Sequence, residues 1–217
     1  MKNLKDIILE KLKISSNTTT VKPSTKKELQ DIIVSEVEKN GYNCDLNFID
    51  TSALTDFNDL FNMYDGPYQH NIHRALKNFN GDISGWDVSN VTDMTACFYE
   101  SSYTGEYGGL DNWDVSNVES MAGMFIRSKF SDEYNDINGW DVSKVVKMPG
   151  MFREMSFNGN ISDWDVSNVK DTQCMFYGNK TFKQNLSKWN LDPACESANM
   201  FGGIKGFPKR FKPKGVQ

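Results

Sequence analysis

The sequence has few of the residues on which disulfide-rich domains and many enzymes depend. It holds four cysteines and two histidines in 217 residues, too few thiols for a disulfide scaffold of this length and too little imidazole for histidine-based catalysis. It also lacks a Cys-x-x-Cys pair, a phosphate-binding glycine loop and a dinucleotide-binding fingerprint. These absences predict a protein that is not an enzyme and that carries no cofactor and no bound metal ion.

Long apolar runs are missing as well. No run approaches the roughly 20 apolar residues that span a bilayer, so we expect no membrane span. At the N-terminus, charges interrupt the apolar residues of MKNLKDIILEKLKI and no small-residue cleavage site follows, so we expect no classical secretion signal. The same segment predicts an amphipathic helix, which forms an arm over residues 1–20 together with a polar linker. The apolar side chains predicted to dock this arm on a partner are Leu4, Ile7, Ile8 and Leu12.

Charge is distributed unevenly around a formal net value of −5. Residues 1–27 contain seven lysines against two acidic residues, and residues 204–217 contain five basic residues and no acidic one. Between these ends, 12 basic residues are outnumbered by 27 acidic residues. An acidic body between two basic ends excludes a uniformly basic nucleic-acid binder, so nucleic acid is not an expected partner.

The sequence repeats itself. Five segments align without a gap, and a sixth, degenerate copy (Ile49–Phe61, IDTSALTDFNDLF) precedes them and is followed by an insertion at about 62–78. The five segments are Trp86–Phe98 (WDVSNVTDMTACF), Trp113–Phe125 (WDVSNVESMAGMF), Trp140–Phe152 (WDVSKVVKMPGMF), Trp164–Phe176 (WDVSNVKDTQCMF) and Trp189–Phe201 (WNLDPACESANMF). Their tryptophans are 27, 27, 24 and 25 residues apart. This fixed register predicts stacked repeats.

Each copy carries an apolar residue three positions before the tryptophan, which gives the spacing apolar-x-x-Trp-x-Val-x-x-Val. Leucine-rich repeats have this spacing. We therefore predict an α/β repeat fold, a leucine-rich-repeat-like solenoid of about six strand–short-helix units with the tryptophans buried in its core. In this reading, Ser116 and Glu119 form a capping box, and Val91, Met94 and Phe98 lie on one helix face.

The two ends of the repeat region need covers, because an open end exposes unpaired backbone. Thr25 and Glu28 form a capping-box start and Gly41 supplies a stop, so we predict a cap helix over residues 25–40. The tail is expected to fold over the last repeat. The predicted domains are the arm and linker (1–20), the N-terminal cap (21–44), the solenoid (45–203) and a basic C-terminal tail (204–217).

The phrase WDVSNV-x-x-M-x-x-MF, preceded by FNGDIS or FNGNIS, resembles the BspA-like leucine-rich repeat family over residues 45–203. Many members of that family look like bacterial surface proteins that bind host or neighbouring-cell proteins, and they usually carry a signal sequence. This chain departs from that pattern. It is similar instead to signal-less repeat proteins of tailed phages of gut bacteria, both in its charged N-terminal segment and in the phrase NCDLN at Asn43–Asn47.

These resemblances imply a non-enzymatic repeat scaffold whose partner is another virion or surface protein. One implied function is a virion-associated structural component that docks through its N-terminal helix and is found in the virion or in the cytoplasm of the producing cell. The alternative is a bacterial cell-surface adhesion or binding protein, which needs an export route.

The position after the tryptophan or its equivalent forms a column of side chains: Asp50, Asp87, Asp114, Asp141, Asp165 and Asn190. We call the four aspartates that follow a tryptophan, Asp87, Asp114, Asp141 and Asp165, the acidic column. Carboxylates stacked about 4.8 Å apart repel one another, so something must offset their charge. The aspartates could cap the turns of their own repeats, form a binding face for a basic partner, or hold a row of cations. No second carboxylate recurs to complete a Ca²⁺ cage.

The parts that differ between repeats are further binding candidates, because tyrosine and arginine are enriched at protein interfaces. Tyr103 and Tyr107 lie in the loop after the second repeat copy, and Arg74 lies in the insertion. His70 and His73 in the same insertion are spaced by one helical turn but have no third metal ligand beside them.

Overall fold

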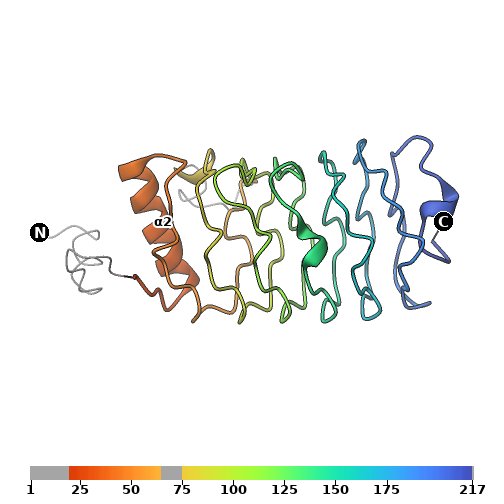
Figure 1. The fold of residues 1–217 in the computed structure, drawn as a ribbon, viewed down its shortest axis with the longest axis horizontal. Coiled ribbons are helices and arrows are strands. Elements are labelled where there is room, and N and C mark those ends of the chain that lie inside the picture. The colour runs from red at the N-terminus through yellow and green to blue at the C-terminus, as the bar shows by residue number, and fades with distance from the viewer. Residues whose placement is uncertain (1–19, 65–74, 217) are drawn as a thin grey trace, which may run out of the picture.

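The computed structural model describes residues 20–64 and 75–216, and the predicted docking side chains Leu4, Ile7, Ile8 and Leu12 therefore lie outside the described residues. The described regular elements are one α-helix, α2 (Lys26–Asn40), and two single-turn 3₁₀ helices, η1 (Ile137–Gly139) and η2 (Lys209–Phe211). The rest of the described chain winds into a stack of coils. Figure 1 shows α2 at one end of this stack and the C-terminus at the other.

The prediction of strand–short-helix units is wrong. In the described ranges no continuous strand and no sheet forms, and neighbouring coils share only isolated parallel bridges. Most of these bridges occur at one repeat position, seven residues after the tryptophan or its equivalent. They are Asp56↔Asp93, Asp93↔Ser120, Ser120↔Lys147, Lys147↔Asp171 and Asp171↔Glu196. This position lies in the half of the unit that was expected to be helical.

Tight turns take the place of both strand and helix in each coil. In the second copy along the chain (Trp86–Phe98), the Val91 N–H donates to the Val88 carbonyl and the Cys97 N–H to the Met94 carbonyl, so the chain reverses every few residues. Ala96 has a φ of 52°, in the left-handed region, which ends any right-handed helix at that point. The apolar spacing of three and four residues therefore reports a series of turns, and the predicted capping box at Ser116 starts no helix.

Left-handed residues recur ten residues after the tryptophan, and this gives the coils a common way to pair. A second left-handed residue follows four positions later, as Glu100 does after Ala96, and in this segment every second N–H group points to the next coil. In the second copy these groups belong to Met94, Ala96, Phe98 and Glu100, and they donate to carbonyls of the next coil at 2.9, 2.8, 2.9 and 2.7 Å. The same four bonds recur at each junction between consecutive copies, so the stack is held by a repeated backbone ladder.

Phenylalanines form the continuous column of the core, which we call the phenylalanine ladder. Its members are Phe61, Phe98, Phe125, Phe152, Phe176 and Phe201. Consecutive rings are stacked with centroids 5.3, 5.5, 5.8, 5.7 and 5.5 Å apart. A second aromatic ring from the following loop packs against most members of the ladder, as Phe130 does on Phe125 at 4.2 Å. Stacked rings at these distances stabilise the interior beyond their area burial.

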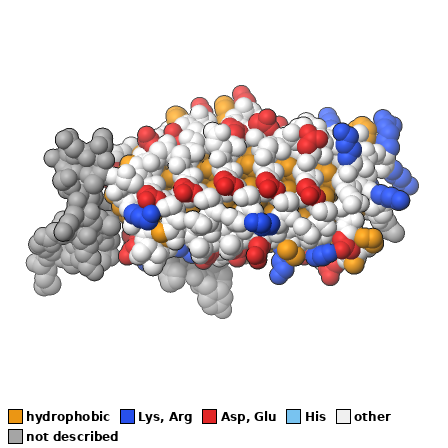
Figure 2. All heavy atoms as spheres, turned by 60° about the horizontal axis from the view of Figure 1, so that its bottom comes forward, with side chains coloured by type: hydrophobic (Ala, Val, Ile, Leu, Met, Phe, Trp, Pro, Cys, Tyr) orange, Lys and Arg blue, Asp and Glu red, His pale blue; other side chains and the backbone are white. Residues whose placement is uncertain are grey.

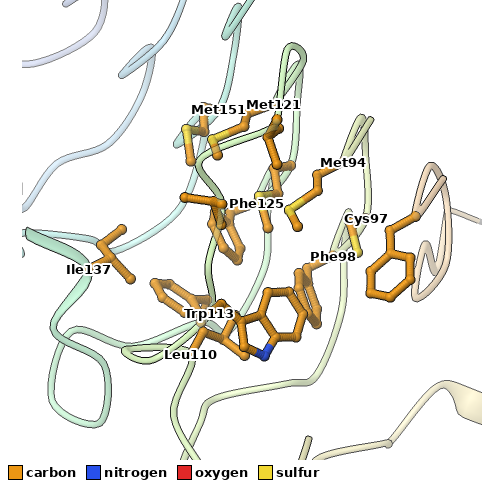
Figure 3. Close-up of a cluster of buried hydrophobic side chains, with 14 of the residues drawn as sticks. Met94, Cys97, Phe98, Leu110, Trp113, Met121, Phe125, Ile137 and Met151 are labelled. Carbon is orange, nitrogen blue, oxygen red and sulfur yellow. The ribbon is translucent and has the colours of Figure 1, made fainter. Parts of the chain in front are cut away.

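The five tryptophans are buried, as predicted, and they also tie each coil to the one before it. The Trp113 Nε1–H donates to the carbonyl oxygen of Ile83 at 3.1 Å, and the equivalent bond recurs for the other four indoles. Figure 3 shows Trp113 packed among Phe98, Phe125 and Leu110. A buried indole N–H with a fixed acceptor satisfies the polar end of an otherwise apolar side chain.

The two ends are covered differently: the predicted helix lies over the first repeat, and the tail packs, as predicted, on the last repeat but covers only part of it. Helix α2 starts at the N-cap Thr25, whose side chain accepts from the Glu28 N–H, and it buries Leu29, Ile32, Ile33 and Val37. At the other end, Phe207 of the tail stacks on Phe201 at 4.3 Å, and the Phe211 carbonyl accepts from the Leu186 N–H. The repeat stack is therefore held between a helix and a basic tail.

Candidate binding surfaces

The acidic column lies on the outside of the stack. Asp87, Asp114, Asp141 and Asp165 are exposed, while the tryptophan before each of them and the valine after it are buried. This alternation follows from the extended segment between two turns, where successive side chains point to opposite sides. Figure 2 shows acidic side chains in a row along the long axis of the molecule, above and below a band of apolar atoms.

Each aspartate of the column also closes a turn in its own repeat. The Oδ1 atoms of Asp87, Asp114, Asp141 and Asp165 accept a hydrogen bond from the backbone N–H two residues later, at 3.0 to 3.1 Å. In Asp87 the same oxygen also accepts from the Ser89 hydroxyl at 2.6 Å. The first of the three alternatives, turn capping, is therefore what the structure shows.

These hydrogen bonds favour the charged form of Asp114, Asp141 and Asp165. Hydrogen bonds from the following serine, first its side chain and then its backbone N–H, hold the pKa values of Asp114, Asp141 and Asp165 below the usual 3.8. The negative charge of Asp141 acts in the opposite direction, because it raises the pKa values of its two neighbours in the column, Asp114 and Asp165. Because Oδ1 is occupied by the turn, Oδ2 of each side chain is the oxygen that remains for a partner.

Basic side chains meet acidic ones at both ends of the stack. Lys22 forms an ion pair with Asp50 at 2.9 Å, and Lys170 pairs with Asp192. Asparagines run beside the column: Asn90 and Asn117 donate through Nδ2 to serine carbonyls of the preceding coil at 3.0 and 2.7 Å. Within residues 20–64 and 75–216, no three His, Cys, Asp or Glu side chains come together as metal ligands would.

A family model described as "Mycoplasma protein of unknown function, DUF285" matches the chain at residues 37–125 and again at 102–213. The two overlapping matches together span almost the whole stack of coils. The chain belongs to the DUF285 family. No curated protein and no solved structure matches it.

The candidate loop residues of this DUF285 chain differ in their exposure to solvent. The prediction that Tyr103 is an exposed binding residue is wrong: its ring is fully buried, it packs on Phe98 at 5.1 Å, and its hydroxyl donates to the Gly108 carbonyl. It occupies the second aromatic position that Phe130 fills one repeat later. Tyr107 is 46% exposed, so it is open to a partner. Arg74, His70 and His73 lie outside the described residues.

A column of half-buried and exposed side chains was not predicted from the sequence. Thirteen residues after the tryptophan, Tyr99, Arg153 and Tyr177 lie at equivalent positions of three DUF285 repeats. The Arg153 guanidinium lies over the Tyr177 ring at 5.3 Å, and Tyr99 packs edge-on against Tyr64 at 5.6 Å. A comparison of the repeats beyond the shared phenylalanine would have found this column.

No described helix is long and apolar enough to cross a membrane.

Asp50, which holds the position of the column in the first, degenerate copy, is expected to contribute to the stability of the fold against acid. A hydrogen bond from the Ser52 hydroxyl, one from Lys22 and one from the Ser52 N–H lower the pKa of Asp50 from 3.8 to about 2. A lowered pKa means that Asp50 stabilises the fold above pH 3.8 and that this contribution is lost as the pH falls towards 2. The stability difference between wild type and Asp50→Asn is therefore expected to shrink over that range. Melting temperatures measured against pH test this.

Ser52→Ala is the matched variant, because it removes the largest cause of the shift and keeps the carboxylate. Its melting temperature is expected to depend less steeply on pH between 3.8 and 2 than that of the wild type. The effect is small in absolute terms, since solvent screens a surface carboxylate. A constant difference between Asp50→Asn and wild type from pH 5 to pH 2 would contradict the assignment.

Proposed function

We propose that this DUF285 protein is a non-enzymatic repeat scaffold that binds other proteins, and that the acidic column is one of its binding faces. The observation that carries the proposal is the arrangement of the four aspartates, which are exposed and are each held at the same repeat position by a turn hydrogen bond. Side chains that are already fixed lose little rotamer freedom when a partner binds. A rigid row of this kind suits a partner with regularly spaced basic groups.

Electrostatics favours a basic protein partner for this face. The region between residues 28 and 203 carries 27 acidic against 12 basic residues, so its field attracts cationic surfaces from a distance. At physiological ionic strength, dissolved salt largely screens the attraction between exposed charges that are more than about 8 Å apart. Binding through the column is therefore expected to weaken steeply with added salt.

Neutralising the column tests the proposal without unfolding the protein. In a variant with Asp87→Asn, Asp114→Asn, Asp141→Asn and Asp165→Asn, the amide oxygens can still close the turns. Asn160 and Asn185 already do so in this chain, accepting from Ser162 and Ser187 at 3.1 and 3.0 Å. The variant is expected to keep its melting temperature within a few degrees and to lose partners that the wild type retains.

The experiment isolates the protein from its native source together with whatever is attached, and compares bound proteins quantitatively at two salt concentrations. The control variant neutralises four exposed carboxylates elsewhere, Glu38, Glu106, Glu133 and Asp163. A partner that is lost with the column variant and kept with the control supports the acidic face. An identical set of partners for wild type and both variants contradicts it.

A more specific proposal concerns the assembly to which the scaffold belongs. Its support is the sequence: a basic N-terminal segment with the apolar set Leu4, Ile7, Ile8 and Leu12, and the likeness to signal-less repeat proteins of tailed phages. On this basis the protein is a virion-associated structural component that docks through residues 1–20. Deleting these residues is expected to abolish incorporation into the particle, and unchanged incorporation would eliminate this form.

A second candidate is a cell-surface adhesion protein, favoured by the WDVSNV phrase that resembles the BspA-like repeats. The two forms make opposite predictions in intact cells. A surface protein is degraded when proteases are added outside the cell, whereas a particle component inside the producing cell is not.

A further inference from the structure

Most backbone hydrogen bonds between the coils run in one direction. At each junction, four N–H groups of one coil donate to carbonyls of the next coil towards the C-terminus, and one row runs the other way, as from the Glu119 N–H to the Thr92 carbonyl and from Val146 to Glu119. One continuous row runs from the Phe61 N–H to Cys97, then from Phe98 to Met124, Phe125 to Met151, Phe152 to Met175 and Phe176 to Met200. Three parallel rows run beside it.

Rows of peptides aligned in this way add their dipoles, as the peptides of a helix do. The positive pole is the end with free N–H groups. In this chain that end is the last repeat, and the negative pole is the end covered by α2. The polarity comes from the backbone alone and is independent of side-chain charge.

At the last repeat the four rows end without an acceptor. The N–H groups of Ser197, Asn199, Phe201 and Gly203, which we call the donor edge, hold the positions that pair with the next coil in every earlier repeat. None of them donates a hydrogen bond to any residue in the described ranges. Asn199 and Gly203 have the left-handed φ values, 56° and 77°, that turn such groups outwards. The edge is therefore a preformed row of backbone donors.

The tail beside the donor edge carries charge of one sign, while the acidic Asp192 and Glu196 of the last repeat bond back to Lys170 and Gln173 of the preceding coil. The tail contributes Lys205, Lys209, Arg210, Lys212 and Lys214 and no acidic residue. Lys212 places its ammonium 5.5 Å from the centre of the Phe201 ring, which caps the phenylalanine ladder with a cation. Figure 2 shows basic side chains gathered at the end of the molecule opposite α2. Backbone polarity and side-chain charge therefore both favour an occupant that presents hydrogen-bond acceptors and negative charge.

We propose that the donor edge docks an extended acidic segment of a protein partner, which pairs as a further rung of the stack. Its backbone carbonyls accept from Ser197, Asn199, Phe201 and Gly203, and its carboxylates pair with the lysines of the tail. Addition of an extended segment to an open backbone edge is a common mode of peptide recognition. The surface is separate from the acidic column, and the inference rests on the proposed function only in taking a protein as partner.

The opposite end of a second copy is not the occupant. That end presents carbonyls, but α2 lies over it (Figure 1), and Lys26 already donates to the Asn58 carbonyl at 2.9 Å and to Asp56. End-to-end stacking of two copies would have to displace this helix, whose four apolar side chains are buried in the core. A separate acidic segment meets no such obstacle.

The probe is a synthetic peptide of residues 91–101 with Cys97→Ala, because this segment carries two acidic residues and already accepts from the preceding coil in the fold. Residue-resolved hydrogen exchange of the full 217-residue chain is measured with and without the peptide. Exchange at the four donor-edge amides is expected to slow by about tenfold or more at saturating peptide. Neutralising the peptide, with Asp93→Asn and Glu100→Gln, is expected to weaken its binding by about tenfold.

Two variants locate the site. Lys205→Glu with Lys209→Glu is expected to weaken peptide binding, whereas Lys180→Glu with Lys183→Glu, exposed on the preceding repeat, leaves it unchanged. The four-asparagine variant of the acidic column binds the peptide as the wild type does, so the two proposals fail separately. Unaltered exchange at the donor edge with millimolar peptide would overturn the inference. So would equal binding of the neutral peptide, preferential protection by a single-stranded oligonucleotide, or protection that grows with protein concentration alone.

Discussion

Trp140→Ala is expected to lower the free energy of unfolding by about 3–5 kcal/mol. Trp140 is in the central part of the stack, where its indole is buried, stacks on Trp164 at 6.4 Å and donates to the Leu110 carbonyl at 3.0 Å. The substitution opens a cavity and leaves a buried carbonyl without its donor. Urea denaturation followed by circular dichroism measures the loss, and a curve that coincides with the wild type contradicts the packing described.

A second substitution at the same site separates the two contributions. Trp140→Phe keeps an aromatic ring in the core but removes the indole N–H, so it is expected to cost less than Trp140→Ala and still more than about 1 kcal/mol. Because each coil contacts only its neighbours, a central defect weakens both halves of the stack. The unfolding transition of Trp140→Ala is therefore expected to be broader, with a lower dependence on urea concentration.

Phe152→Ala is the other substitution with a large expected effect, also about 3–5 kcal/mol. Its ring stacks on Phe125 at 5.8 Å, on Phe157 at 4.2 Å and on Phe176 at 5.7 Å, so it joins the two aromatic columns across three coils. Differential scanning calorimetry of the purified variant measures the change.

Two controls make this prediction specific to the ladder. Tyr177→Ala changes an exposed ring one residue after Phe176 and is expected to cost less than about 1 kcal/mol. Phe201→Ala acts on the last ladder member, with a neighbouring coil on one side only, and is expected to cost less than Phe152→Ala. Equal losses of unfolding free energy for Phe152→Ala and Phe201→Ala would show that stacking on a ladder ring at both sides adds no stability over stacking at one side.

The repeat register and the helix were predictable from the sequence, and the conformation of each repeat was not. Thr25, Glu28 and Gly41 are local signals, and they placed α2 correctly. The spacing of Val91, Met94 and Phe98 fits a helix face and a chain of turns equally well. The left-handed residue between them is Ala96 in one copy and Cys174 in another, and neither residue type signals that conformation. Gly123 and Gly150 at the same position were the available hint.

The acidic column was predictable because it follows the repeat period, and so was its capping role. Tyr103 was misplaced because it was treated as part of a variable loop. Its distance of five residues from Phe98 equals that of Phe130 from Phe125 and of Phe157 from Phe152, which marks a core position. The donor edge was beyond reach from the sequence, since it consists of backbone groups whose direction depends on left-handed residues such as Asn199 and Gly203.

Consecutive coils are joined by parallel backbone hydrogen bonds rather than by strands and helices. Through-hydrogen-bond NMR couplings between amide nitrogens and carbonyl carbons test this directly. We expect a coupling from Phe125 to Met151, with equivalent couplings from Met121, Gly123 and Arg127 to the coil that contains Met151. Couplings from Phe125 to Met121 instead, four residues earlier as in an α-helix, would contradict it.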